Sequence, residues 1–123
     1  MTDHGRRVLV VEDDADVRGA LAAVLEVAGY QVVEAAHGGE ALDHLRAASK
    51  SFCMILLDLF MPTMNGWAFR AEQLRDPGLA AIPVVVISAD ARTEQKAGQL
   101  GALAHLKKPI DVDALVSLVD AHC

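Results

Sequence analysis

One stretch of sequence indicates the fold most clearly, Cys53-Met54-Ile55-Leu56-Leu57-Asp58. Five apolar residues in a row, followed by a turn-forming segment that contains Asn65-Gly66, are typical of a strand buried on both faces. A carboxylate at the end of such a strand is unexpected, because burying an unpaired charge costs several kcal/mol. The site must therefore neutralise Asp58 or supply a cation, unless Asp58 only opens a turn by accepting hydrogen bonds from nearby backbone amides.

Short apolar strands alternate with segments of helical periodicity along the whole chain. Continuous apolar strands in such an alternation indicate a parallel sheet covered on both faces, and right-handed crossovers make it a doubly wound α/β fold. The second strand is less apolar and is expected near an edge, and the fourth helix is expected to be weak because it has few apolar residues. The strands are predicted at 7–11, 30–34, 53–57, 82–87 and 102–106, and the helices at about 17–28, 40–48, 66–75, 91–100 and 112–119.

Composition is consistent with one domain, expected to span residues 1–123 with no appended output domain. The chain has 123 residues, 53% of them hydrophobic and only 4% aromatic, so its core must be built from aliphatic side chains. The net charge of −6 argues against non-specific binding to nucleic acid or to an anionic membrane surface. No apolar stretch approaches the ~20 residues that span a bilayer. Cys53 is expected to be a small buried hydrophobe, which fits a reduced, intracellular compartment.

Polar side chains follow four of the predicted strands, at the edge where ligands gather in open α/β sheets. Glu12-Asp13 follow the first strand, Asp58 the third, Ser88 the fourth and Lys108 the fifth. Clustered carboxylates suit a hard divalent cation, Mg²⁺ or Mn²⁺, and a lysine with a hydroxyl can hold the oxygens of a phosphoryl group. The set therefore predicts a phosphate beside a metal, with a carboxylate able to attack phosphorus.

Each of these residues also has a simpler explanation when taken alone. The acids Glu12 and Asp13 are suited to charge the start of the following helix, where anions are favoured by up to ~1 kcal/mol each. Ser88 can be an ordinary turn residue, and Lys108 a solvated surface lysine. Their common position at one edge of the sheet favours the functional interpretation.

A resemblance to a known family rests on five stretches, of which the most specific is Asp58-Leu59-Phe60-Met61-Pro62-Thr63-Met64-Asn65-Gly66. The others are 8–14, 36–42, 82–89 and Lys108-Pro109. In order and spacing, the chain resembles the receiver domain of response regulators in two-component signalling, over nearly its whole length. The resemblance implies a flavodoxin-like (βα)5 sandwich with a parallel sheet of order 2-1-3-4-5 and helices on both faces.

The resemblance also implies roles for individual residues. Asp58 would be the phosphoacceptor, taking a phosphoryl group from a phosphohistidine on a sensor histidine kinase or phosphotransfer protein. Glu12, Asp13, Asp58 and the backbone carbonyl of Phe60 would hold Mg²⁺. Phe60 and Asp90 sit where the family tunes the loss of the phosphoryl group. Lys108 would pair with the Asp58 carboxylate and later with a phosphoryl oxygen, and Ser88 would hold another phosphoryl oxygen. Ala89 would leave room for the donor, and Pro109 is a candidate cis-proline.

Switching would follow from the same site, since a phosphoryl group attracts Ser88 and its loop, and the weak fourth helix is the element expected to shift. The family has a Tyr or Phe on the fifth strand that rotates inward, whereas this chain has His105 there. His105 is either an exposed edge-strand histidine or a switch with added pH sensitivity. The fourth helix, fifth strand and fifth helix form the expected output surface.

The leading hypothesis is a cytoplasmic phosphorelay receiver that signals to a downstream protein, without direct contact to nucleic acid or membrane. It would be a monomer or a phosphorylation-dependent homodimer, and not an enzyme beyond slow self-dephosphorylation. One alternative is a pseudo-receiver, a protein interaction module that takes no phosphate. Another is a Mg²⁺-dependent phosphohydrolase, but Phe60 stands where such enzymes carry their second Asp.

Overall fold

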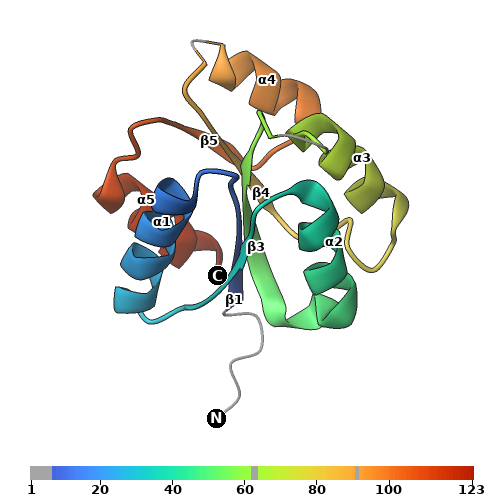
Figure 1. The fold of residues 1–123 in the computed structure, drawn as a ribbon, viewed down its shortest axis with the longest axis horizontal. Helices are drawn as coiled ribbons and strands as arrows, with labels where there is room; N and C mark the ends of the chain where they lie inside the picture. The colour runs from blue at the N-terminus through green and yellow to red at the C-terminus, as the bar shows by residue number, and fades with distance from the viewer. Residues whose placement is uncertain (1–6, 62–63, 91) are drawn as a thin grey trace.

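The computed structural model describes residues 7–61, 64–90 and 92–123, so Pro62 and Thr63 of the Asp58 motif lie outside the described residues. Its centre is a sheet of five parallel strands in the order β2-β1-β3-β4-β5, as the resemblance implied (Figure 1). The strand that ends in Asp58 is in the middle of this sheet, and the less apolar second strand is at its edge. The strands are β1 (Arg7–Val11), β2 (Gln31–Ala35), β3 (Phe52–Asp58), β4 (Val84–Ser88) and β5 (Ala104–Lys107).

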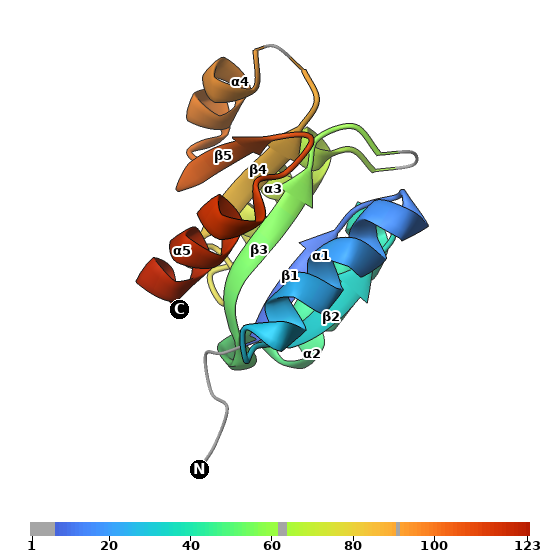
Figure 2. The same cartoon turned by 90° about the vertical axis from the view of Figure 1, so that its left-hand side faces the viewer.

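Helices cover both faces of the sheet. Helices α1 and α5 pack on one face, which is turned toward the viewer in Figure 2, and α2, α3 and α4 pack on the other. A short 3₁₀ turn, η1 (Ser49–Ser51), was not predicted from the sequence. The α-helices are α1 (Ala15–Val27), α2 (Gly38–Ala47), α3 (Gly66–Arg75), α4 (Thr93–Leu100) and α5 (Val112–His122).

The apolar run in β3 fills two separate cores. Met54 and Leu56 join the core beneath α1 and α5, whereas Ile55 and Leu57 join the core beneath α2, α3 and α4. All four side chains are fully buried. Because successive strand residues point to opposite faces, a strand between two helical layers has to be apolar at every position.

Local chemistry explains two element boundaries that differ from the prediction. Helix α1 begins at Ala15 rather than at 17, because the Asp14 carboxylate accepts hydrogen bonds from the backbone N–H groups of Asp16 (2.9 Å) and Val17 (3.2 Å). Strand β4 begins at Val84 rather than at 82, since Pro83 has no N–H to donate to a neighbouring strand.

The expectation for the cysteines was wrong. Cys53, at the start of β3, forms a disulfide with Cys123, which follows α5. Their Cα atoms are 5.3 Å apart although the residues are separated by 70 positions in sequence. The prediction failed because hydrophobic periodicity describes a residue's own strand and carries no information on a partner so distant. The disulfide also removes the argument for a reduced compartment.

We predict that reducing this disulfide destabilises the protein. In the chain-entropy account, a bond that closes a loop of this length contributes about 4 kcal/mol by restricting the unfolded chain. Urea unfolding with and without a phosphine reductant should show a lower free energy of unfolding after reduction. The variant Cys53→Ser/Cys123→Ser should have the same free energy of unfolding as the reduced protein, whether or not the reductant is present. Equal midpoints for the oxidised, reduced and double-variant proteins would contradict the prediction.

Candidate functional site

Three carboxylates meet at the carboxyl edge of the sheet. Glu12 and Asp13 follow β1 and Asp58 ends β3, and these two strands are parallel neighbours in which Val11 pairs with Leu57. One oxygen from each carboxylate lies within 4.8 Å of the others. Glu12 is 1% and Asp58 4% exposed, while Asp13 is exposed to solvent. Adjacent strand ends thus bring together the acids predicted from sequence.

Lys108 reaches this cluster from the loop that follows β5. Its Nζ donates hydrogen bonds of 3.0 Å to both carboxylate oxygens of Glu12 and lies 3.7 Å from Oδ2 of Asp58. Its backbone N–H donates to the carbonyl of Ser88 (2.9 Å), which ties this loop to the end of β4. The Lys108–Pro109 peptide bond is cis. Lys108 is therefore closer to Glu12 than to Asp58, the partner implied by the resemblance.

The surroundings of Asp58 favour its neutral form. The pKa of Asp58 is raised to about 7, mainly by burial and further by the charge of Glu12 and a hydrogen bond with its carboxyl group. Lys108 and the Phe60 N–H, which donates to Oδ1 (3.3 Å), lower this pKa but do not compensate. Because its charged form is destabilised, the Asp58 carboxylate gains from binding any cation that enters the cluster.

The pKa of Lys108 is also raised, which in a lysine favours the charged form. Burial by itself would lower the pKa of Lys108, but the hydrogen bond to Glu12 and the charges of Asp58, Glu12 and Asp13 raise it above its ordinary value. Lys108 is therefore a permanent cation in this site at neutral pH, held by the carboxylates.

Ser88 is the last residue of β4, the strand beside β3, and its side chain is fully buried. Its Oγ accepts a hydrogen bond from the Asp90 N–H (3.1 Å), and its hydroxyl hydrogen remains available to a further acceptor. Ala89, the next residue, is exposed and small. His105 lies on β5 opposite Val86 and is half-buried. Its part in switching stays a prediction.

The loop after Asp58 depends on Gly66. A Cβ built at Gly66 would lie 2.8 Å from the Cα of Leu59, so only glycine fits this close approach without a shift. The Gly66 N–H donates to the carbonyl of Leu59 (3.0 Å), and the Asn65 side chain caps α3 through the Ala68 N–H (2.9 Å). The Asn65-Gly66 pair thus fixes both the return of the loop and the start of α3.

Sequence reasoning missed a group beside the site, formed by Lys96 of α4 and the rings of Phe60 and Trp67. Lys96 Nζ lies 4.7 Å from the Phe60 ring centroid and 5.7 Å from that of Trp67. Lys96 also pairs with Asp90 at 2.9 Å. These residues come from four separate segments with no common period, so no sequence pattern indicated that they meet.

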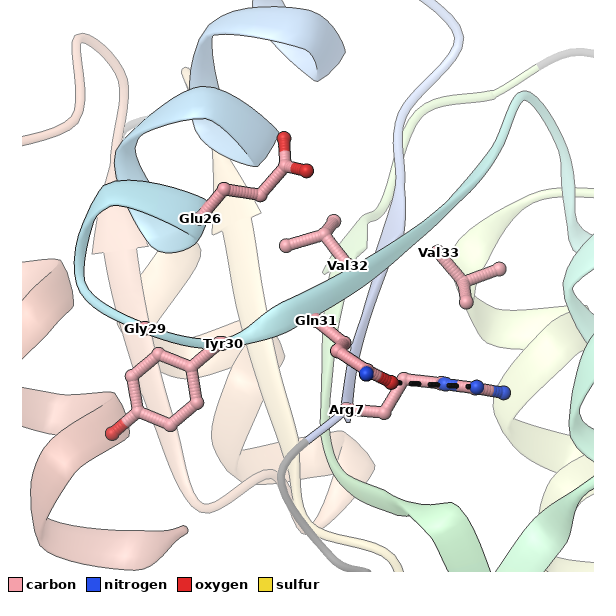
Figure 3. A pocket seen from close by; sticks show the side chains of 7 residues that line it. All are labelled: Arg7, Glu26, Gly29, Tyr30, Gln31, Val32 and Val33. Atoms are coloured by element: carbon pink, nitrogen blue, oxygen red, sulfur yellow. Dashed lines mark hydrogen bonds between the residues drawn. The ribbon is translucent and has the colours of Figure 1, made fainter. Parts of the chain in front are cut away.

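A hollow at the opposite end of the sheet has a different character (Figure 3). It is lined by Arg7 at the start of β1, Gln31 at the start of β2 and Glu26 near the end of α1. Arg7 donates to Oε1 of Gln31 at 3.5 Å. Among the described residues that line it, Glu26 is the single carboxylate. It therefore lacks the acidic cluster that distinguishes the carboxyl edge.

The carboxylate cluster suits a magnesium ion. Mg²⁺ prefers oxygen ligands, needs only one or two carboxylates and keeps several waters, some of which a phosphoryl oxygen can replace. Glu12, Asp13 and Asp58 offer three carboxylate oxygens close enough to share one ion. Burial, together with the charge of Glu12, raises the pKa of Asp58, so a cation in the cluster would stabilise its charged form. The donor set therefore fits the cation predicted from sequence.

Comparison with known proteins identifies the family that the sequence resembles. The sequence model of the family described as response regulator receiver domain matches residues 8–120. The chain is 32% identical over 117 residues to PilH of Pseudomonas aeruginosa, covering 94% of this chain and 95% of PilH. It is 36% identical over 120 residues to SphR of Synechococcus elongatus, a transcriptional regulatory protein. This match covers 90% of this chain but only 46% of SphR.

Solved structures of receiver proteins have the same fold. The crystal structure of the chemotaxis protein CheY4 of Vibrio cholerae superposes with a TM-score of 0.86 at 27% identity, covering 97% of this chain and 99% of CheY4. The chain belongs to the receiver domains of response regulators. Proteins of this family are signalling domains of two-component systems that interact with histidine kinases and downstream effectors and bind Mg²⁺ at an acidic pocket. Within its described part, this chain has no helix of the length and apolarity needed to cross a membrane.

The raised pKa of Asp58 leads to a prediction about stability and pH in the absence of divalent metal. Because Asp58 binds its proton more tightly in the folded than in the unfolded protein, its contribution to stability is full below the unfolded pKa of 3.8 and is lost as the pH rises to about 7. Between about pH 5 and pH 8, wild type should lose on the order of 2 kcal/mol relative to Asp58→Asn.

Urea unfolding of both proteins in a metal chelator would measure this difference. The variant Asp43→Asn, which makes the same chemical change on the exposed face of α2, is the matched control and should follow wild type. A constant difference between wild type and Asp58→Asn across this pH range would show that Asp58 titrates normally.

Proposed function

We propose that the chain is a phosphorelay receiver whose phosphoacceptor is Asp58. The observation that carries this proposal is a buried carboxylate, held beside two further acids and one lysine, at the end of the central strand. Such a group is poorly stabilised as a bare anion, and its neighbours can hold both a metal and the oxygens of a phosphoryl group.

The reaction that fits this site is transfer from a phosphohistidine. A carboxylate oxygen of Asp58 attacks phosphorus, the P–O bond forms, and the P–N bond breaks with its electron pair going to the departing imidazole. Glu12, Asp13, Asp58 and the backbone carbonyl of Phe60 would hold Mg²⁺, which when bound neutralises charge on the phosphoryl oxygens.

The chain's own residues would supply the remaining contacts. Lys108 lies between Glu12 and Asp58, within reach of a phosphoryl oxygen on Asp58, and its permanent charge favours the transferring group. The Ser88 hydroxyl can donate its hydrogen to another oxygen while still accepting from Asp90. Ala89 leaves room for the donor to approach. Lys108 would change partners, from Glu12 toward the new phosphoryl group.

The proposed partners follow from this chemistry. The donor is a sensor histidine kinase or a histidine phosphotransfer protein, and the output is a downstream protein that contacts α4, β5 and α5. One relative, CqsS of Vibrio cholerae, is a sensor kinase/phosphatase of which the chain covers 17% at 33% identity. Self-dephosphorylation is expected to be slow at most. A monomer or a phosphorylation-dependent homodimer in the cytoplasm is part of the same proposal.

A second candidate is a pseudo-receiver that binds partners without taking phosphate. The observation that favours it is His105 on β5, where the family has Tyr or Phe. The intact set of Glu12, Asp13, Asp58 and Lys108 favours phosphorylation instead, because an interaction module has no need of a destabilising buried acid.

We predict that acetyl phosphate adds one phosphoryl group to the wild-type protein only when Mg²⁺ is present, as seen by intact-protein mass. Asp58→Asn should show no gain, because the attacking oxygen is replaced by an amide. Asp43→Asn, the exposed control, should be labelled like wild type. Lys108→Met should be labelled at least ten-fold more slowly, since removing one preorganised donor to a developing negative charge costs about two to three orders of magnitude in rate in an oxyanion hole.

Two results would contradict the proposal. Labelling of Asp58→Asn to the wild-type extent would place the phosphoryl group elsewhere. An unlabelled wild type, under conditions that label a known receiver, would support the pseudo-receiver.

A further inference from the structure

Helix α4 is attached to the rest of the protein by few apolar contacts. Ala97 is buried and Leu100 is half-buried against the core. Apart from Lys96, the other described side chains of α4 are exposed, namely those of Glu94, Gln95 and Gln99. A helix that buries so little apolar area depends on polar contacts for its position.

Arg70 of α3 anchors the carboxyl-terminal end of α4. Its guanidinium donates hydrogen bonds to the carbonyls of Leu100 (3.0 Å) and Gly101 (3.2 Å), and to Oε1 of Gln73 (2.7 Å). Arg70 is only 9% exposed. A buried cation at the carbonyl end of a helix satisfies groups that the helix leaves unpaired, so this end of α4 is firmly held.

In the other half of α4, Lys96 makes the polar side-chain contacts that the structure describes. Its side chain is only 16% exposed, and Nζ pairs with Oδ2 of Asp90 at 2.9 Å. The same ammonium group lies against the rings of Phe60 and Trp67, which pack edge to face with centroids 5.6 Å apart. A cation between aromatic rings and a carboxylate is held from several sides.

Two partners of Lys96, Phe60 and Asp90, are hydrogen-bonded to residues of the proposed phosphorylation site. The Phe60 N–H donates to Oδ1 of Asp58 (3.3 Å), and the Asp90 N–H donates to Oγ of Ser88 (3.1 Å). Phe60 and Asp90 each lie two residues from a residue that would hold the phosphoryl group. A movement of Ser88 toward that group would therefore displace Asp90 and strain its contact with Lys96.

We propose that Lys96 is a latch residue, which holds α4 and the loop of residues 88–90 against Phe60 and Trp67 and opposes their movement toward a phosphoryl group. The proposal rests on Asp58 being the phosphoacceptor, and it makes Lys96 a positioning residue that touches no reacting atom. Contacts that stabilise one conformation lower the affinity of any ligand that prefers the other. Weakening the latch should therefore increase affinity for a phosphoryl group.

The test compares Lys96→Met, which keeps the aliphatic stem and removes the cation, with Lys96→Arg, which keeps a cation able to lie against the rings. The matched control is Arg92→Met, because Arg92 lies 3.9 Å from the same Asp90 carboxylate, but its side chain is 73% exposed. Arg92 has no ring contact in the described structure. Each variant is titrated with beryllofluoride and Mg²⁺, a phosphoryl analogue whose binding is followed by fluorine NMR.

Lys96→Met should bind beryllofluoride about three- to ten-fold more tightly than wild type, the range expected for losing a partly buried cation–π contact and ion pair. Lys96→Arg and Arg92→Met should stay within about two-fold of wild type, which lies inside the scatter of exposed charge contacts. Unchanged or weaker binding by Lys96→Met would overturn the latch.

Hydrogen exchange of the same proteins without the analogue tests the latch separately. Amides of α4 should exchange several-fold faster in Lys96→Met than in wild type, while those of α2 should not change. Wild type that binds no beryllofluoride would refute Asp58 as the phosphoacceptor, and the exchange comparison would still decide the latch. Equal exchange of α4 amides in Lys96→Met and wild type would overturn it.

Discussion

The structure depends on one electrostatic constraint, the burial of Asp58 beside Glu12 at the carboxyl end of the sheet. Two acids in this position repel each other and lose their hydration, so the fold has to supply a compensating charge. Lys108 provides it from the far side of β4, and its own backbone is tied to Ser88. The loops after β1, β3 and β5 are consequently linked through one group of charges, and the backbone of Lys108 ties the end of β4 to them.

The two ends of the molecule are held differently. At the amino end of β3, a disulfide joins Cys53 to Cys123, and the Tyr30 hydroxyl donates to Asp120 of α5. At the carboxyl end, α4 has little apolar burial and is held by Arg70 at one end and Lys96 near the other. Stability is thus concentrated away from the site, while the helix nearest to it is attached by polar contacts that can be exchanged at small cost. This distribution suits a signalling domain.

Much of the site could be predicted from residues at strand ends, because parallel strands present their carboxyl ends at one edge. Glu12, Asp13, Asp58, Ser88 and Lys108 were found in this way, and the structure places them at that edge. The pairing of Lys108 with Glu12 rather than Asp58 was not predictable, since it depends on differences of less than an ångström. The contacts of Lys96, Trp67 and Arg70 were not predicted, because their partners lie on other elements. A cation on a polar helix normally indicates only a solvated face.

The sequence by itself determined the order of strands and helices, the parallel sheet and the two-sided burial of β3. It could do so because apolar periodicity and capping residues act over a few neighbouring positions. Only the tertiary structure decided which charges pair, how far the pKa of Asp58 rises, that the two cysteines bond and what holds α4. These depend on distances between residues remote in sequence and on the exclusion of water around them, and neither exists until the helices have packed on both faces of the sheet.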